Sequence, residues 1–250
     1  MATVNDTILE VRATRFREKY GLGSCDPVPI YELLNELNVL TNFRPLSRNF
    51  SGMALKTSDD LKMILVNSEQ ILARQHFTIG HELYHLFIQE EFSFMICNVG
   101  RCDKKEREEY NADVFSSYLL MPKAGILNLI PEEELARGGE ISLPTIVRLE
   151  QFFGVSRSAI LVRLGKLGLI DYQDYVDKYK NGIQKSAYEL GYPTSLYVKG
   201  IHYQEVIGDY GAVSKRLYEE GDISESHYFS LMNDINVNID KEFTDDDELW

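Results

Sequence analysis

The segment from residue 71 to 89 limits the possible folds of this 250-residue chain more than any other. We expect it to form one helix with apolar residues on nearly every side, which is typical of a helix buried at the centre of a domain. A polar side chain on such a helix needs a partner, because an unpaired buried polar group costs free energy. This segment nevertheless contains His81, Glu82 and His85. The sequence therefore predicts a central helix that carries a polar site.

These three residues form the pattern His-Glu-x-x-His over residues 81–85. Side chains four residues apart on a helix point the same way, with Cβ atoms about 5–6 Å apart, so two imidazoles can share one zinc ion. Glu82 follows the first histidine directly, and its carboxylate can reach a metal-bound water without being a ligand. The alternative is that both histidines serve packing or capping, and the predicted burial of the helix weakens that reading.

A catalytic zinc site needs a third protein ligand and an open fourth position. The next predicted helix, residues 106–120, places Glu109 and Asp113 on one face. We interpret Glu109 as the third ligand and Asp113 as a carboxylate that orients one of the ligand histidines. Glu106 and Glu108 are the competing candidates, and the alternative is that Glu109 belongs to a solvated acidic face over residues 106–109. The spacing of Glu109 to the residues Ala112, Asp113 and Phe115 favours it as the ligand.

The chemistry of such a site is hydrolysis. Zinc lowers the pKa of its bound water to about 7 and polarises a carbonyl group. Glu82 would act as the general base and pass the proton to the leaving amine. Tyr84, Tyr110 and His76 are candidate oxyanion donors, although such residues more often serve packing or lie on the surface. The strand predicted over residues 51–56 is a candidate platform for a substrate that adds as a further β-strand.

The fold class that we predict is α+β. Its core is mostly helical, with a small three-stranded antiparallel sheet, and helix-turn-helix-like and C-terminal helical segments follow. Short connections between the strands favour a meander. In the first helix, Ile8, Val11 and Phe16 are expected to point inward. The predicted helices span residues 1–20, 30–37, 71–89, 106–120, 143–153, 156–164, 206–219 and 224–233, and the predicted strands span residues 39–43, 51–56 and 61–66.

Composition excludes some classes of protein. The net charge of −13 opposes general nucleic-acid binding, which needs clustered basic residues. The N-terminus lacks a signal-peptide pattern, and no apolar run reaches the roughly 20 residues that cross a bilayer. Cys25, Cys97 and Cys102 fit a reducing compartment, so we expect a cytoplasmic protein with free thiols. The acidic segment 240–250 fits a solvated terminus, the alternative being a peptide that competes with a charged partner.

Three motifs carry a resemblance to a known family. They are Arg-Gln-His-Phe-Thr-Ile-Gly-His-Glu-Leu-Tyr-His-Leu at residues 74–86, Glu-x-x-Ala-Asp-x-Phe at 109–115 and Leu-Leu-Met-Pro at 119–122. Over residues 10–170 the chain resembles the ImmA/IrrE metallopeptidases, and His81, His85, Glu109 and Glu82 match the metal and catalytic positions of that family. Gly80 and Ser116 depart from the family pattern, in which alanine is frequent at both positions.

The resemblance implies a zinc-dependent endopeptidase with one zinc ion. Its substrate would be a helix-turn-helix repressor of a mobile element, phage or stress regulon. We divide the chain into a zincin-like metallopeptidase domain (1–140), a helix-turn-helix-like segment packed on it (141–171) and a helical C-terminal region with the acidic tail (172–250). The helix-turn-helix-like segment is interpreted as structural or as a docking surface, rather than as a direct DNA contact.

Two other functions stay open at the level of sequence. The protein could be a non-cleaving zinc-containing module that sequesters a repressor, as in a toxin–antitoxin pair, although such a binder has no use for Glu82. It could also be a DNA-binding regulator, which the net charge opposes. The sequence does not define the substrate, the cleavage site or the oligomeric state.

Overall fold

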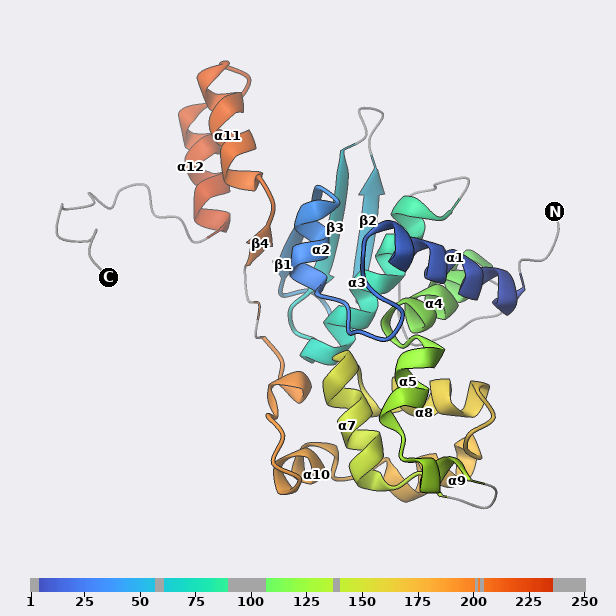
Figure 1. Cartoon of the computed structure of the whole chain (residues 1–250). Helices are drawn as coiled ribbons and strands as arrows, with labels where there is room; N and C mark the ends of the chain where they lie inside the picture. Colours follow the sequence, from blue (N-terminus) through green and yellow to red (C-terminus); the bar gives the residue numbers. More distant parts are fainter. Residues whose placement is uncertain are drawn as a thin grey trace, which may run out of the picture.

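The computed structural model describes residues 5–56, 61–89, 107–136, 140–200, 202 and 205–235. The first half contains α1 (Asp6–Lys19), α2 (Ile30–Glu36), β1 (Val39–Arg44), β2 (Gly52–Lys56), β3 (Lys62–Asn67), α3 (Leu72–Phe87) and α4 (Arg107–Leu120). The second half contains α5 (Lys123–Leu129), α6 (Glu132–Leu135), α7 (Leu143–Phe153), α8 (Arg157–Lys166), α9 (Tyr172–Tyr179), α10 (Ile183–Glu189), η1 (Ser195–Tyr197), β4 (Val206–Ile207), α11 (Tyr210–Glu219) and α12 (Glu225–Asp234). Helices predominate beside one small sheet, so the predicted α+β class is confirmed (Figure 1).

The sheet is mixed, and its strand order within the described residues is β2-β3-β1-β4. β1 and β3 run parallel, whereas β2 and β4 pair antiparallel with β3 and β1. The predicted three-stranded antiparallel meander is therefore wrong, although each predicted strand lies within one residue of an observed one. β3 lies between β1 and β2, so β1 and β2 are not neighbours. The segment predicted as one helix over residues 206–219 begins with β4, which pairs with the edge of β1 opposite β3, and its helix starts only at Tyr210.

The side chain of Asn67 ties the end of β3 to the loop between β1 and β2. Asn67 ends β3, is 1% exposed, and bonds to the connection that carries the chain from β1 across to β2. Its amide nitrogen donates to the carbonyl oxygens of Ser47 at 3.0 Å and Phe50 at 2.7 Å, and its amide oxygen accepts from the backbone N–H of Leu46 at 3.0 Å. One buried amide thus satisfies the backbone of the crossing loop, where no sheet partner is available.

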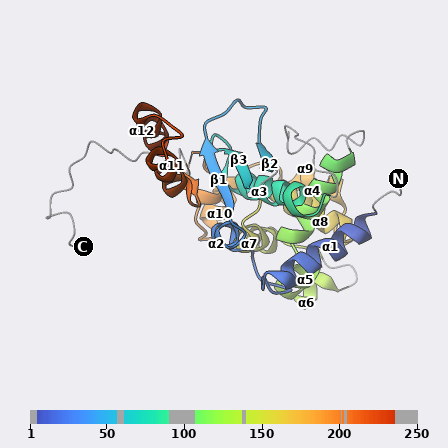
Figure 2. The same cartoon turned by 90° about the horizontal axis from the view of Figure 1, so that it is seen from above.

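Helix α3 lies at the centre of the molecule, between the sheet and α4 (Figure 2). Its residues from 78 to 86 are all buried, as the sequence predicts for this helix. Burial on all sides explains why the helix lacks the polar stripe of a surface helix. Every polar side chain on its second half is therefore inside the protein.

Helix α1 packs through a face that the sequence pattern does not reveal. Ile8 and Val11 are 46% and 43% exposed, so their predicted inward position is wrong, while Phe16 is in the core as expected. The buried face carries Arg17, whose guanidinium donates to several backbone carbonyl oxygens, including that of Leu119 at 2.6 Å. A buried arginine at a core position breaks the apolar periodicity on which the prediction depended.

Helices α7 and α8 form the predicted pair, with Gly154 in the left-handed conformation between them (φ 65°). Glu150 and Arg157 are 0% and 2% exposed, and they form an ion pair in the interior. Arg163 is 1% exposed and donates to the carbonyl oxygen of Met121 at 3.1 Å. Two of the basic side chains of this segment are therefore engaged inside the protein.

Some predicted features lie outside the described residues. They are Glu106, Cys97, Cys102 and the acidic segment 240–250. Across the part of the chain that the structure covers, no helix combines the length and the apolar character that crossing a membrane requires.

Candidate metal centre

Helix α3 supplies three of the residues that the sequence singles out. His81, Glu82 and His85 are 1%, 0% and 3% exposed. The Nε2 atoms of His81 and His85 lie 3.2 Å apart, so both rings direct the same nitrogen toward one point. The spacing of four residues along the helix produces this convergence.

Helix α4 brings Glu109 to the same point. Its Oε2 atom lies 3.3 Å from Nε2 of His81, and its Oε1 atom lies 3.4 Å from Nε2 of His85. One ligand atom from each of the three residues falls within 4.8 Å of the others, which is close enough for all three to hold one metal ion. Two imidazoles and one carboxylate are a donor set typical of zinc in peptidases.

The second nitrogen of each imidazole also has a partner. Nδ1 of His81 lies 2.9 Å from Oδ1 of Asp113, and Nδ1 of His85 lies 2.6 Å from Oε1 of Gln89. Each Nδ1–H can therefore donate outward, which leaves the Nε2 lone pair directed at the shared point. Sequence reasoning placed Asp113 in this role but missed Gln89, which stands four residues after His85, just beyond the end of α3.

Small residues let α4 approach α3 closely enough to deliver Glu109. A Cβ atom at Gly80 would lie 2.5 Å from Oγ of Ser116, which no real Cβ contact tolerates. Ser116 in turn donates to the carbonyl oxygen of Phe77 at 2.9 Å. The glycine next to the first histidine thus makes room for a serine on α4.

A second glycine lets β2 approach the same face of α3. A Cβ atom at Gly52 would lie 2.5 Å from Cγ2 of Thr78 and 3.3 Å from Oε1 of Glu82. Ala54, two residues further on, is 3% exposed and faces the same way in the strand. Glu82 therefore lies against the beginning of β2. Sequence reasoning missed Gly52 and Thr78; a glycine inside a predicted strand is the only sign of such an approach.

The electrostatics of the site favour an ionised Glu109. Burial opposes its ionisation, but His81 and His85, when their Nε2 atoms carry protons in the absence of a metal, outweigh burial and lower the pKa of the carboxyl group. Its side chain is 13% exposed, so solvent reaches the site on one side. An ionised carboxylate beside two Nε2 atoms is the form that binds a divalent metal.

The other candidates are engaged elsewhere. Glu108, a competitor for third ligand, accepts a hydrogen bond from the hydroxyl of Tyr84 at 2.7 Å. The hydroxyl of Tyr110 donates to Asp6 at 3.0 Å, and Nδ1 of His76 pairs with a backbone carbonyl oxygen at 2.8 Å. The two tyrosine hydroxyls and Nδ1 of His76 are thus bonded to groups other than the metal ligands.

Comparison with protein families agrees with this geometry. The family model described as the IrrE N-terminal-like domain matches residues 34–165, which is more than half of the chain. The chain therefore belongs to the ImmA/IrrE family, which is a family of metallopeptidases. The matched range includes β1 to α8 and all the residues of the candidate metal centre. No curated protein matches the chain.

Proposed function

We propose that this protein is a zinc-dependent endopeptidase and that His81, His85 and Glu109 hold its zinc ion. The observation that carries the proposal is the convergence of two Nε2 atoms and one carboxylate within 4.8 Å, beside Glu82, in a chain of a metallopeptidase family. The donor set and the occupied Nδ1 atoms both fit zinc. Bound there, the ion supplies a Lewis acid for the scissile carbonyl and an acidified water.

Residues around the zinc ion then have separate roles in the reaction. Glu82 removes a proton from the attacking water and transfers it to the nitrogen that leaves when the peptide bond breaks. The contact that Oε1 of Glu82 would make with a Cβ atom at Gly52 supports a carboxylate directed toward the beginning of β2. Asp113 and Gln89 hold the two imidazoles in the orientation that ligation needs.

We place the substrate along β2. This strand pairs only with β3 among the described strands, so it stands at an edge of the sheet. An extended peptide can add to such an edge through backbone hydrogen bonds, with its carbonyl groups near Glu82. We propose a helix-turn-helix repressor of a mobile element, phage or stress regulon as the substrate, cleaved in the cytoplasm. The support for this repressor is the family resemblance of the sequence.

The second candidate is a zinc-containing module that sequesters the repressor, as in a toxin–antitoxin pair, without cutting it. Glu82 argues against it, because a carboxylate that is 0% exposed is costly to bury and a binder gains nothing from it.

Intact-mass spectrometry separates the two functions. The zinc-loaded protein is mixed with the helix-turn-helix repressor encoded beside its gene, and Glu82→Gln is run in parallel. The exposed Glu36→Gln is the matched control. Peptidase activity predicts two complementary fragments with the parent and with Glu36→Gln, and none with Glu82→Gln. A stable complex without fragments in all three samples would contradict the enzyme and support sequestration.

A further inference from the structure

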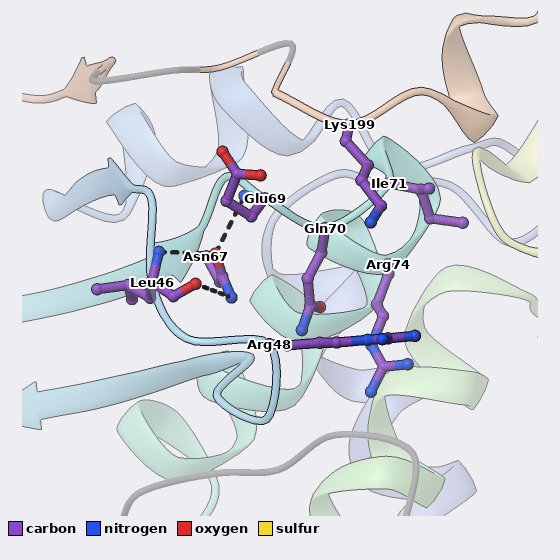
Figure 3. A pocket seen from close by; sticks show the side chains of 8 residues that line it. All are labelled: Leu46, Arg48, Asn67, Glu69, Gln70, Ile71, Arg74 and Lys199. Carbon is purple, nitrogen blue, oxygen red and sulfur yellow. Dashed lines mark hydrogen bonds between the residues drawn. The ribbon is translucent and has the colours of Figure 1, made fainter.

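A pocket of about 410 Å³ lies at the N-terminal end of α3, outside the candidate metal centre (Figure 3). Its lining includes three basic side chains, Arg48, Arg74 and Lys199, and one acidic side chain, Glu69. Figure 3 shows the guanidinium ends of Arg48 and Arg74 in the same part of the pocket, with the ammonium group of Lys199 directed toward them. The Glu69 carboxylate points away from them. A chain of net charge −13 thus contains a locally positive pocket.

The wall of the pocket is held in place by buried amides. Asn67 fixes the loop that carries Arg48, through the hydrogen bonds to Leu46 and Phe50 described above. Gln70, 9% exposed, donates to Oγ of Ser51 at 2.9 Å. Since the backbone on both sides of Arg48 is tied to the end of β3, the pocket is formed before any ligand binds.

Two of the three cations of the pocket, Arg48 and Lys199, have no counter-charge in contact with them among the described residues. The third cation, Arg74, interacts with the carboxylate of Asp113. Gathering like charges costs free energy, and a bound anion would offset that cost. Guanidinium groups bind carboxylates in a matching planar geometry.

The pocket lies on the path of the proposed substrate. Arg74 stands seven residues before His81 on α3, which is two turns or about 10 Å along the helix axis. Ser51, tied to the pocket through Gln70, directly precedes β2, and Gly52 lies against Glu82. A peptide extended along β2 covers about 10 Å in three residues. The side chain three positions from the scissile bond therefore reaches the pocket.

We propose that this pocket binds an acidic side chain of the substrate, about three residues from the cleaved bond. Arg48, Arg74 and Lys199 are then specificity residues for a peptide that carries aspartate or glutamate at that position. The position relative to the cleaved bond rests on the proposed peptidase function. Binding of a peptide carboxylate in the pocket does not depend on the peptidase function, so carboxylate binding and cleavage specificity are tested separately.

Binding is tested by NMR on the isotopically labelled full chain, without any need for cleavage. Three probes are titrated: the capped peptide Ac-Ala-Ala-Glu-Ala-Ala-NH2, its Gln counterpart, and inorganic phosphate. We expect the Glu peptide to shift the side-chain Nε–H signals of Arg48 and Arg74, and the Gln peptide to leave them in place. The Arg48→Gln/Lys199→Gln double variant should lose the response of Arg74. Both substituted residues are exposed, so the variant should fold. No shift with the Glu peptide, or an equal shift with phosphate, would overturn the proposal.

Specificity is tested by cleavage of a proteome-derived peptide library. The parent should enrich Asp and Glu about three positions from the cut, and the double variant should lower that enrichment about tenfold. The exposed Lys185→Gln removes a positive charge outside the pocket and should retain the enrichment. Cleavage without acidic enrichment would overturn the proposed subsite and leave the peptidase intact. Absence of any cleavage would contradict the peptidase, while the NMR titration still decides on the pocket.

Discussion

Oδ1 of Asp113 lies 2.9 Å from Nδ1 of His81, and this contact joins α4 to the opposite side of the imidazole from the metal-facing Nε2. Asp113 is 18% exposed and also lies near Arg74, so it connects the candidate metal centre to the edge of the basic pocket. The contact fixes both the orientation and the tautomer of the ring. In the proposed metal centre Asp113 is then a positioning residue rather than a ligand.

Replacing Asp113 should therefore weaken zinc binding without abolishing it. We expect Asp113→Ala to lower zinc affinity by about 10- to 100-fold, because His81 loses the partner that orients it. Competition with a chromophoric chelator measures the affinity. Asp177→Ala, at an exposed aspartate of α9, is the control and should bind zinc like the parent. Equal affinity in both variants would show that Asp113 does not position His81.

The two departures from the family pattern, Gly80 and Ser116, face one another. Gly80→Ala alone should destabilise the protein by about 1–3 kcal/mol, because its Cβ would meet Oγ of Ser116. Adding Ser116→Ala removes that oxygen and leaves a Cβ–Cβ distance of 3.4 Å, so the double variant should recover most of the loss. Urea unfolding of the parent, both single variants and the double variant gives the coupling free energy between the two positions. Additive effects of the two substitutions would contradict a direct contact between these sites.

Stability should fall in weak acid through His76. Burial, aided by nearby His202, lowers the pKa of His76 below its ordinary value of 6.5, and the Gly154 carbonyl only partly opposes this. Below pH 6.5 the unfolded chain therefore binds a proton at this site that the folded protein does not. The free energy of unfolding should decrease with falling pH, by at most about 1.4 kcal/mol per pH unit from this group.

The measurement is urea unfolding between pH 7.5 and 5.0 of the parent and of His76→Gln. The free energy of unfolding is plotted against pH for both proteins. The difference between the two plots gives the contribution of His76, because the carboxyl groups titrate at lower pH in both proteins. The parent should lose stability faster than the variant below pH 6.5. Parallel curves would mean that His76 has an ordinary pKa in the folded protein.

Local features of the fold followed from the sequence, whereas the pairing of elements did not. Apolar composition predicted the central helix, and the turn residues between strands predicted three strands within one residue of their positions. The strand order depends on contacts between distant residues, such as those of Asn67 with the loop between β1 and β2, and no local periodicity reveals them. The inward face of α1 was misassigned because Arg17, normally a surface residue, is 3% exposed and bonds to backbone carbonyl oxygens.

The candidate site shows the same division. The spacing of four residues was enough to predict that His81 and His85 lie together, because a helix brings side chains at that spacing to the same face. Choosing Glu109 over Glu108 depended on its spacing to residues 112–115 of the same helix. The basic pocket was not predicted at all, since Arg48, Arg74 and Lys199 are far apart in the sequence and only the fold of the loop after β1 and the segment before β4 brings them together.

X-ray absorption at the zinc edge gives the sharpest test of the proposed metal centre. We predict one zinc ion per chain, with nitrogen and oxygen ligands alone at about 2.0–2.1 Å. His85→Ala should lose the bound zinc, whereas the exposed His227→Ala should retain it with an unchanged spectrum. Sulfur ligands at about 2.3 Å, or full zinc binding by His85→Ala, would place the ion elsewhere and contradict a centre built from His81, His85 and Glu109.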